Sequence, residues 1–253
     1  MTASSPTPAV HVYADKAELV AGTAAQMVTM IGDAIAQRGR CALALSGGST
    51  PKPLYATLAQ ADLPWDKLYI YWGDERYVPI DHQDSNAKMA KEAWLDQVPI
   101  PAENVFIVPT ATDSPAASAE AYQAMLASSF DSQAAAPPVF DIVLLGMGDD
   151  GHTASLFPNT PALEETTRWV TVGSKDGQPR ITFSVPLINR ARQIIFLIAG
   201  ANKQSALAQV FAPSADSSLY PSRLIAPTDG AIYWFMDKAA SQGLPDTAAY
   251  IEH

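Results

Sequence analysis

A histidine follows an aspartate at a spacing of two residues in the segment GMGDDGHT (146–153). A short turn lets the Asp150 carboxylate hold one imidazole nitrogen of His152 and leave the other nitrogen free. Histidine suits general acid and base work near neutrality, because its unperturbed pKa is about 6.5. We therefore predict that His152 is a general base oriented by Asp150, with a purely structural histidine as the alternative.

The same segment also satisfies the dinucleotide pattern Gly-x-Gly-x-x-Gly, with Glu164 and Glu165 about 20 residues further on. Two aspartates in the turn would repel a pyrophosphate, and Pro158 would cut short the helix that should follow. A zinc site is equally disfavoured, because the other histidines show no ligand spacing to His152. We expect neither a metal nor a cofactor.

A second candidate segment, SGGSTP (46–51), lies between an apolar run and a predicted helix. Its glycines let backbone amides approach a ligand closely, its hydroxyls add donors, and Pro51 suits a helix start, where no N–H is required. Unpaired amides at a helix N-terminus favour phosphate. The predicted phosphate-binding residues are Gly47, Gly48, Ser49 and Thr50. The alternative is a tight turn in which Thr50 caps the helix; a P-loop and a nucleophile elbow are excluded by their missing residues.

Two further segments carry charge after predicted strands. In WGDERY (72–77), Asp74, Glu75 and Arg76 could supply a proton acceptor, a structural carboxylate and a cation for a developing oxyanion. In GANK (200–203), Lys203 opposes the helix dipole, which makes sense if an anion binds nearby. Arg180, at the start of a predicted strand, is a further candidate for ligand binding. The alternative for each is a solvated surface charge.

These segments must be positioned by a fold. Short apolar runs alternate along the chain with segments of helical periodicity. This alternation predicts a doubly wound α/β fold with a mostly parallel sheet and helices on both faces. In such sheets ligands collect beyond the carboxyl ends of the strands. The predicted strands are Cys41–Leu45, Leu68–Trp72, Val105–Val108, Phe140–Leu145, Trp169–Val172, Ile181–Val185, Gln193–Ile198 and Ala231–Phe235. The predicted helices are Lys16–Arg38, Pro53–Gln60, Asn86–Leu95, Ala116–Phe130 and Asn202–Phe211.

We expect one domain over residues 1–253, with residues 1–10 disordered and surface loops at 134–138, 174–179 and 213–221. The chain has 16 basic and 26 acidic residues, a net charge of −10, which argues against a broad nucleic-acid surface. Its one cysteine, Cys41, cannot form an internal disulfide. With no signal peptide and no uninterrupted apolar run of ~18 residues, we expect a cytoplasmic protein that does not bind membranes, a monomer or weak homo-oligomer.

Taken in order, the segments LSGGSTP (45–51), WGDER (72–76), GMGDDGHTASLFP (146–158) and GANK (200–203) resemble those of the 6-phosphogluconolactonase family, over about Val12 to Phe235. The resemblance implies hydrolysis of 6-phospho-D-glucono-1,5-lactone to 6-phosphogluconate in the oxidative pentose phosphate pathway. It implies His152 as the base that activates water, Asp150 as its orienting acid and Arg76 as the oxyanion stabiliser. The implied substrate-binding residues are Gly47, Gly48, Ser49, Thr50, Lys203, Arg180 and Asp74.

The related glucosamine-6-phosphate isomerases differ at two positions. They carry a glutamate that assists ring opening where this chain has Phe157, and Asp-Glu-Tyr where it has Asp74-Glu75-Arg76. Phenylalanine cannot transfer a proton, so the lactonase branch is favoured and an aminosugar-phosphate isomerase or deaminase is the alternative. A non-catalytic sugar-phosphate sensor is a third hypothesis, disfavoured because no basic helix-turn-helix segment precedes Cys41.

Overall fold

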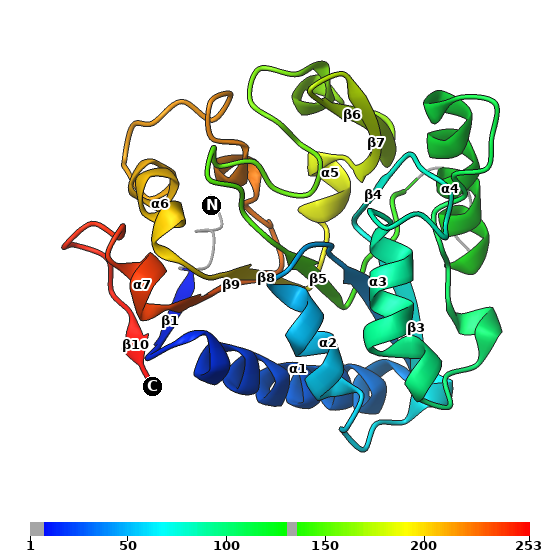
Figure 1. The fold of residues 1–253 in the computed structure, drawn as a ribbon, viewed down its shortest axis with the longest axis horizontal. Helices are drawn as coiled ribbons and strands as arrows, with labels where there is room; N and C mark the ends of the chain where they lie inside the picture. The colour runs from blue at the N-terminus through cyan, green and yellow to red at the C-terminus, as the bar shows by residue number, and fades with distance from the viewer. Residues whose placement is uncertain (1–7, 131–135) are drawn as a thin grey trace.

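The computed structural model describes residues 8–130 and 136–253, and its centre is a seven-stranded sheet in which every strand pair is parallel (Figure 1). The strand order is β10-β1-β9-β8-β5-β2-β3. The strands are β1 (Ala9–Tyr13), β2 (Cys41–Leu45), β3 (Leu68–Trp72), β5 (Ile142–Leu145), β8 (Gln193–Ile198), β9 (Ala231–Asp237) and β10 (Ile251–Glu252). In Figure 1 the helix α1 runs beneath the sheet, and α5 and α6 lie above it.

The helices follow the strands in the alternation that the sequence predicts. They are α1 (Lys16–Arg38), α2 (Pro51–Leu58), α3 (Asn86–Ala93), α4 (Pro115–Ser129), α5 (Val185–Ile188), α6 (Gln204–Val210) and α7 (Lys238–Ser241). Short 3-10 helices span Trp65–Lys67, Leu95–Gln97, Ala102–Asn104, Pro161–Glu164, Ala201–Lys203 and Pro221–Leu224. The prediction of a mostly parallel α/β fold is confirmed.

Helix α1 shows how local signals set an element's ends. The Asp15 carboxylate accepts hydrogen bonds from the amides of Ala17 (2.8 Å) and Glu18 (2.9 Å), and Gly39 ends the helix at φ 76°. Among the described residues, α1 is the one helix long and apolar enough to cross a membrane by length and composition. One of its faces is buried in the core, against the sheet, as in the core helix of a globular domain.

The central strands are buried on both faces. All five residues of β2 are buried, and β8 is buried at every position after Gln193. Cys41, the first residue of β2, is fully buried, and burial raises the pKa of its thiol.

A second, antiparallel sheet of three strands, β4-β7-β6, lies beside the large one. Its strands are β4 (Asp74–Arg76), β6 (Val170–Lys175) and β7 (Gln178–Phe183). Arg76 and Arg180 are direct cross-strand neighbours. Buried residues of both sheets belong to one hydrophobic cluster, so the small sheet is part of the same α/β unit.

Three predictions about local structure are wrong. Ala9 and Val10 are not disordered, because they pair with β9 as part of β1; Pro8 is described but is in neither helix nor strand, and residues 1–7 of that predicted segment lie outside the described residues. The predicted strand Val105–Val108 makes only an isolated bridge from Val105 to Ile70. The predicted loop 174–179 is instead the tip of the β6–β7 hairpin, with its turn at Asp176 and Gly177.

The other two predicted loops agree with the structure over most of their described residues. Residues 213–220 form turns without helix or strand, as expected. Residues 136–138 of the predicted loop 134–138 are also irregular, and 134 and 135 lie outside the described part of the chain.

Candidate active site

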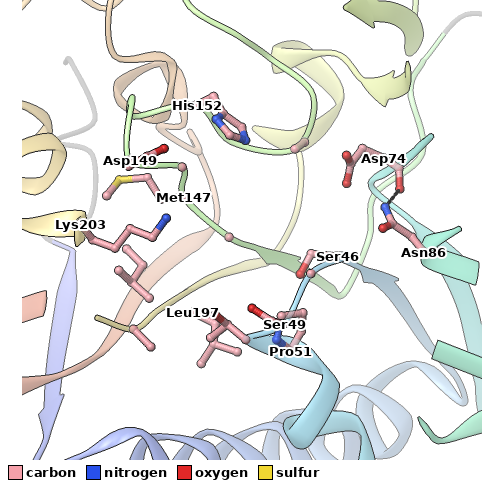
Figure 2. Close-up of a pocket in the computed structure, with 18 of the residues that line it drawn as sticks. Ser46, Ser49, Pro51, Asp74, Asn86, Met147, Asp149, His152, Leu197 and Lys203 are labelled. Carbon is pink, nitrogen blue, oxygen red and sulfur yellow. Dashed lines mark hydrogen bonds between the residues drawn. The ribbon is translucent and has the colours of Figure 1, made fainter. Parts of the chain in front are cut away.

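The carboxyl ends of β2, β3, β5 and β8 converge on a cavity of about 270 Å³ (Figure 2). It is lined by all of the predicted site residues except Asp150, namely Gly47, Gly48, Ser49, Thr50, Asp74, Arg76, His152, Arg180 and Lys203. Four segments that are far apart in the sequence therefore meet in one place, as the position of ligand sites in open α/β sheets predicts.

His152 and Asp150 form the pair expected from their spacing. The imidazole Nδ1 lies 2.5 Å from Asp150 Oδ1, which also accepts a hydrogen bond from the His152 amide (3.0 Å). Burial alone would raise the pKa of Asp150, but the hydrogen bonds from His152 and the charges of His152 and Lys175 outweigh it and hold that pKa well below its usual value. Asp150 is therefore an ionised anchor behind the ring, and Nε2 is the nitrogen left for chemistry.

The loop that carries this pair, residues 146–158, is called the histidine loop below. Gly148 donates to the His152 carbonyl (2.8 Å), and the Thr153 hydroxyl donates to the Gly146 carbonyl (2.8 Å). A Cβ on Gly148 would overlap Nδ1 of His152, so the ring packs where only glycine leaves room. The amide and hydroxyl of Ser222 both donate to the Gly151 carbonyl (3.0 and 2.9 Å). The loop is thus fixed by its own hydrogen bonds and by a neighbouring segment.

Phe157 lies beside the catalytic candidate. Its ring centroid is 4.5 Å from that of His152, and the cations of Lys175 and Arg180 lie 5.6 and 5.7 Å from its centroid. Phe157 is 5% exposed. An apolar ring therefore occupies the position next to His152 at which the isomerases place an acid.

Residues 46–50, called the glycine turn below, connect β2 to α2. The Tyr55 hydroxyl fixes its start, because it accepts from the Ser46 amide (3.0 Å) and donates to the Ser46 carbonyl (2.6 Å). Gly48 has φ 106°, a conformation that other residues rarely adopt. The amides of residues 47–50 have no hydrogen-bond partner among the described residues. Thr50 makes no side-chain capping bond to α2, so the alternative of a Thr50-capped turn is wrong.

Lys203 ends the 3-10 helix that follows β8, and its side chain lines the cavity. Figure 2 shows its amine pointing into the cavity, on the side where Met147 and Asp149 lie. The amine makes no ion pair within the described part of the chain. A cation and a row of open amides thus face the same space.

The two carboxylates of the segment Asp74–Arg76 have different surroundings. Asp74 is 7% exposed and accepts a hydrogen bond from the Ser155 hydroxyl on Oδ2 (2.7 Å). Glu75 is buried and accepts from the amides of Asn86 and Ala87 at the start of α3 (2.8 Å each). Burial raises the pKa of Glu75, and these amides partly oppose the shift. Glu75 is therefore structural, as one reading of the sequence expected.

Arg76 and Arg180 bring two cations together at the cavity. Arg76 donates to the Asp84 carbonyl through Nη1 (2.7 Å), but the Nε atoms of both arginines are buried without a partner among the described residues. Burial and the charge of Arg76 lower the pKa of Arg180. Two adjacent, partly buried guanidinium groups favour an anionic ligand.

Sequence reasoning missed Asn86, which lines this cavity, and Ser155, which is not a lining residue but bonds to Asp74. Asn86 lines the cavity from α3 and bonds to the main chain of Asp74, and Ser155 holds the Asp74 carboxylate. Both are reached only through tertiary contacts between distant segments. The one sequence signal for Asn86 is its place after Ser85, a residue typical of a helix N-cap. Within residues 8–130 and 136–253, no group of three His, Cys, Asp or Glu could hold a metal ion.

Comparison with known proteins agrees with this arrangement. Residues 14–234 match the family described as glucosamine-6-phosphate isomerases/6-phosphogluconolactonase. The chain is 53% identical to a 6-phosphogluconolactonase of Synechocystis over 94% of its length and 98% of the relative's, and 55% identical to one of Nostoc over 93% and 98%.

Solved structures give the same result. The 6-phosphogluconolactonase of Trypanosoma brucei superposes with a TM-score of 0.83 at 33% identity, covering 96% of this chain and 100% of that one. The enzyme of Trypanosoma cruzi gives 0.86 at 31%, covering 98% and 100%. The chain belongs to the family of glucosamine-6-phosphate isomerases and 6-phosphogluconolactonases.

Proposed function

We propose that this chain is a lactone hydrolase that converts 6-phospho-D-glucono-1,5-lactone to 6-phosphogluconate in the pentose phosphate pathway. The observation that carries the proposal is the Asp150–His152 pair on a cavity that also contains the glycine turn and Lys203. The four relatives described above carry the name of this activity. We place the reaction in the cytoplasm.

In the proposed mechanism, Nε2 of His152 removes a proton from water as the oxygen attacks the lactone carbonyl. Asp150 holds the ring through Nδ1 and stabilises the imidazolium that forms. When the tetrahedral intermediate collapses, the imidazolium returns its proton to the departing ring oxygen. One residue therefore serves as base and then as acid, and the ester bond breaks without a covalent bond between substrate and enzyme.

The phosphate of the substrate would bind at the glycine turn. The amides of residues 47–50 are open, the N-terminus of α2 adds its positive dipole, and Lys203 supplies a full charge. The hydroxyls of Ser49 and Thr50 are additional donors. This local positive site would let a chain with a net charge of −10 bind an anion.

The remaining cations would act on the oxygens of the reacting end. Arg76 is our candidate for stabilising the oxyanion, and Arg180, its cross-strand neighbour, supports the same negative charge. The Oδ1 atom of Asp74 has no partner among the described residues and would accept a hydrogen bond from a sugar hydroxyl. Ser155 fixes the carboxylate in that orientation.

Phe157 separates this proposal from the isomerase alternative. Ring opening of an aminosugar phosphate calls for an acid near the histidine, and the phenyl ring packed on His152 has no proton to give. The cations of Lys175 and Arg180 also lie over this ring, and the Asp150 carboxylate beside His152 is already bonded to Nδ1.

The test is proton release at constant pH from freshly generated 6-phosphogluconolactone, corrected for spontaneous hydrolysis, beside ammonia release from glucosamine 6-phosphate. We expect rapid turnover of the lactone and none of the aminosugar phosphate. Lactone hydrolysis at the spontaneous rate would refute the proposal, and ammonia release would establish the alternative.

A further inference from the structure

Asn86 is a polar side chain of the cavity to which the mechanism above gives no role. It is the first residue of α3 and is 1% exposed. Its amide donates to Glu75 Oε1 (2.8 Å), and Ser85 before it caps α3 by accepting from the Lys88 amide (3.1 Å). The main chain of Asn86 is therefore fixed to β4.

The side-chain amide of Asn86 has one satisfied end and one open end. Its Nδ2 donates to the main-chain carbonyl of Asp74 (2.9 Å), the dashed line in Figure 2. This bond sets the amide's orientation, so Oδ1 points away from β4. Oδ1 is buried and has no hydrogen-bond partner among the described residues. A buried acceptor without a donor is costly, and such an atom needs an explanation.

The open end of this amide lies against the glycine turn. A Cβ on Gly47 would overlap Oδ1, Cγ and Nδ2 of Asn86, so the amide packs directly against the glycine backbone. No other residue type at position 47 would allow that contact without a shift. Asn86 thus connects the glycine turn to Asp74 by a hydrogen bond on one side and close packing on the other.

From this contact we infer that Asn86 is a positioning residue for the reaction: it fixes the glycine turn at a set distance from Asp74 and Arg76. The inference rests on the proposed function, because it assumes that the turn holds the substrate's phosphate. A rigid connection would keep the phosphate and the reacting carbonyl at matched positions, and a small misplacement of bound groups can cost up to about 100-fold in rate. An asparagine fits this place because it donates to a carbonyl and carries no negative charge beside a bound anion.

The experiment measures binding of inorganic phosphate by titration calorimetry, together with KM and kcat for 6-phosphogluconolactone. For Asn86→Ala we expect phosphate affinity about tenfold weaker, KM raised by a similar factor and kcat lowered by about tenfold, because the carbonyl is then misplaced relative to Arg76. Asn86→Asp keeps the shape but loses the donor and adds a charge, so we expect phosphate affinity at least as weak. If Asn86→Ala does not fold, the same measurements on Asn86→Asp test the inference.

The matched control is Ser85→Ala at the neighbouring position of the same helix end. It removes the cap of α3 and should lower the melting temperature while phosphate affinity stays within about twofold of wild type. Equal weakening of phosphate binding by both variants would overturn the inference, because the effect would then be general damage to α3. Unchanged affinity in Asn86→Ala would overturn it as well.

A double-mutant cycle tests the contact itself. Gly47→Ala should weaken phosphate binding strongly in the wild type, because its Cβ collides with Asn86. In the Asn86→Ala background the collision is removed, so the same change should cost at least about threefold less. Additive effects would overturn the inference.

The outcomes separate the inference from the proposed function. A wild-type enzyme that hydrolyses the lactone but shows no dependence of phosphate affinity on Asn86 refutes only the inference. Asn86-dependent phosphate binding without lactone turnover refutes the proposed function, and the role of Asn86 is then limited to the phosphate site. A wild type that binds no phosphate overturns the inference.

Discussion

The histidine loop and the glycine turn lie on the same cavity but use their backbone groups in opposite ways. The histidine loop uses its groups in hydrogen bonds within the protein: Gly148, Thr153 and Ser222 donate to carbonyls of the loop, and Ser155 bonds to Asp74. The glycine turn leaves the amides of residues 47–50 without partners among the described residues. A base that must take a proton from a water in one orientation needs a rigid support, whereas an anion site needs donors that the protein does not use itself.

The largest effect should come from removing the base. For His152→Ala we expect kcat/KM for the lactone to fall by about 10³-fold, since a positioned base contributes about 10²–10⁴-fold. Phosphate affinity should remain within about twofold of wild type, because the glycine turn is untouched. A pH-stat assay with calorimetry in parallel checks both parts; retained turnover would remove His152 from the mechanism.

Gly148→Ala breaks the support of the histidine without deleting it. Its Cβ would overlap Nδ1 and displace the ring from Asp150. We expect kcat to fall by about 100-fold while KM changes little, because a misplaced group loses most of its effect. Steady-state kinetics decide this: a change confined to KM would mean that the loop's rigidity serves binding instead of catalysis.

Lys203→Ala acts on the other region. We expect KM to rise by about tenfold, with a smaller fall in kcat, because in the proposed complex the lost charge contacts the phosphate and not the reacting carbonyl. The matched control is Lys67→Ala, which removes the same charge from an exposed lysine paired with Asp66 outside the cavity. If both substitutions raised KM equally, the effect would be one of net charge and Lys203 would have no specific role.

The smallest effect concerns stability in acid. The pKa of Asp150 is lower in the folded chain than in the unfolded one, so its contribution is present above the unfolded pKa of about 3.9 and is lost as pH falls below it. The side chain is 39% exposed, so screening keeps this contribution below about 1 kcal/mol. Urea unfolding at pH 6 and pH 3 should show a smaller loss of stability for Asp150→Asn than for wild type. Equal losses would contradict this assignment.

Much of the parallel sheet could be predicted from sequence, because strands such as Gln193–Ile198 are apolar at every position and helix α1 carries its own cap and stop signals. Strand β4 could not, since Asp74-Glu75-Arg76 has no apolar pattern. Its carboxylates are buried only because Ser155 and the amides of α3 satisfy them. Those partners become visible only when distant segments meet.

The candidate site divides in the same way. The Asp150–His152 pair is local, so its spacing of two residues was enough to predict the contact. The adjacency of Arg76 and Arg180 depends on a register between two strands, and the role of Asn86 depends on the absence of a side chain at Gly47. Neither relation has a signature within one segment.

The single thiol of the chain stands at the start of the strand that leads into the glycine turn, fully enclosed and with its pKa raised. Only the thiolate form of a cysteine reacts quickly with peroxide or alkylating agents. The Cys41 thiol is not ionised at neutral pH, and it is not in contact with solvent. The folded enzyme should therefore keep its activity in buffers without reductant. Oxidation of Cys41 should not inactivate the folded enzyme.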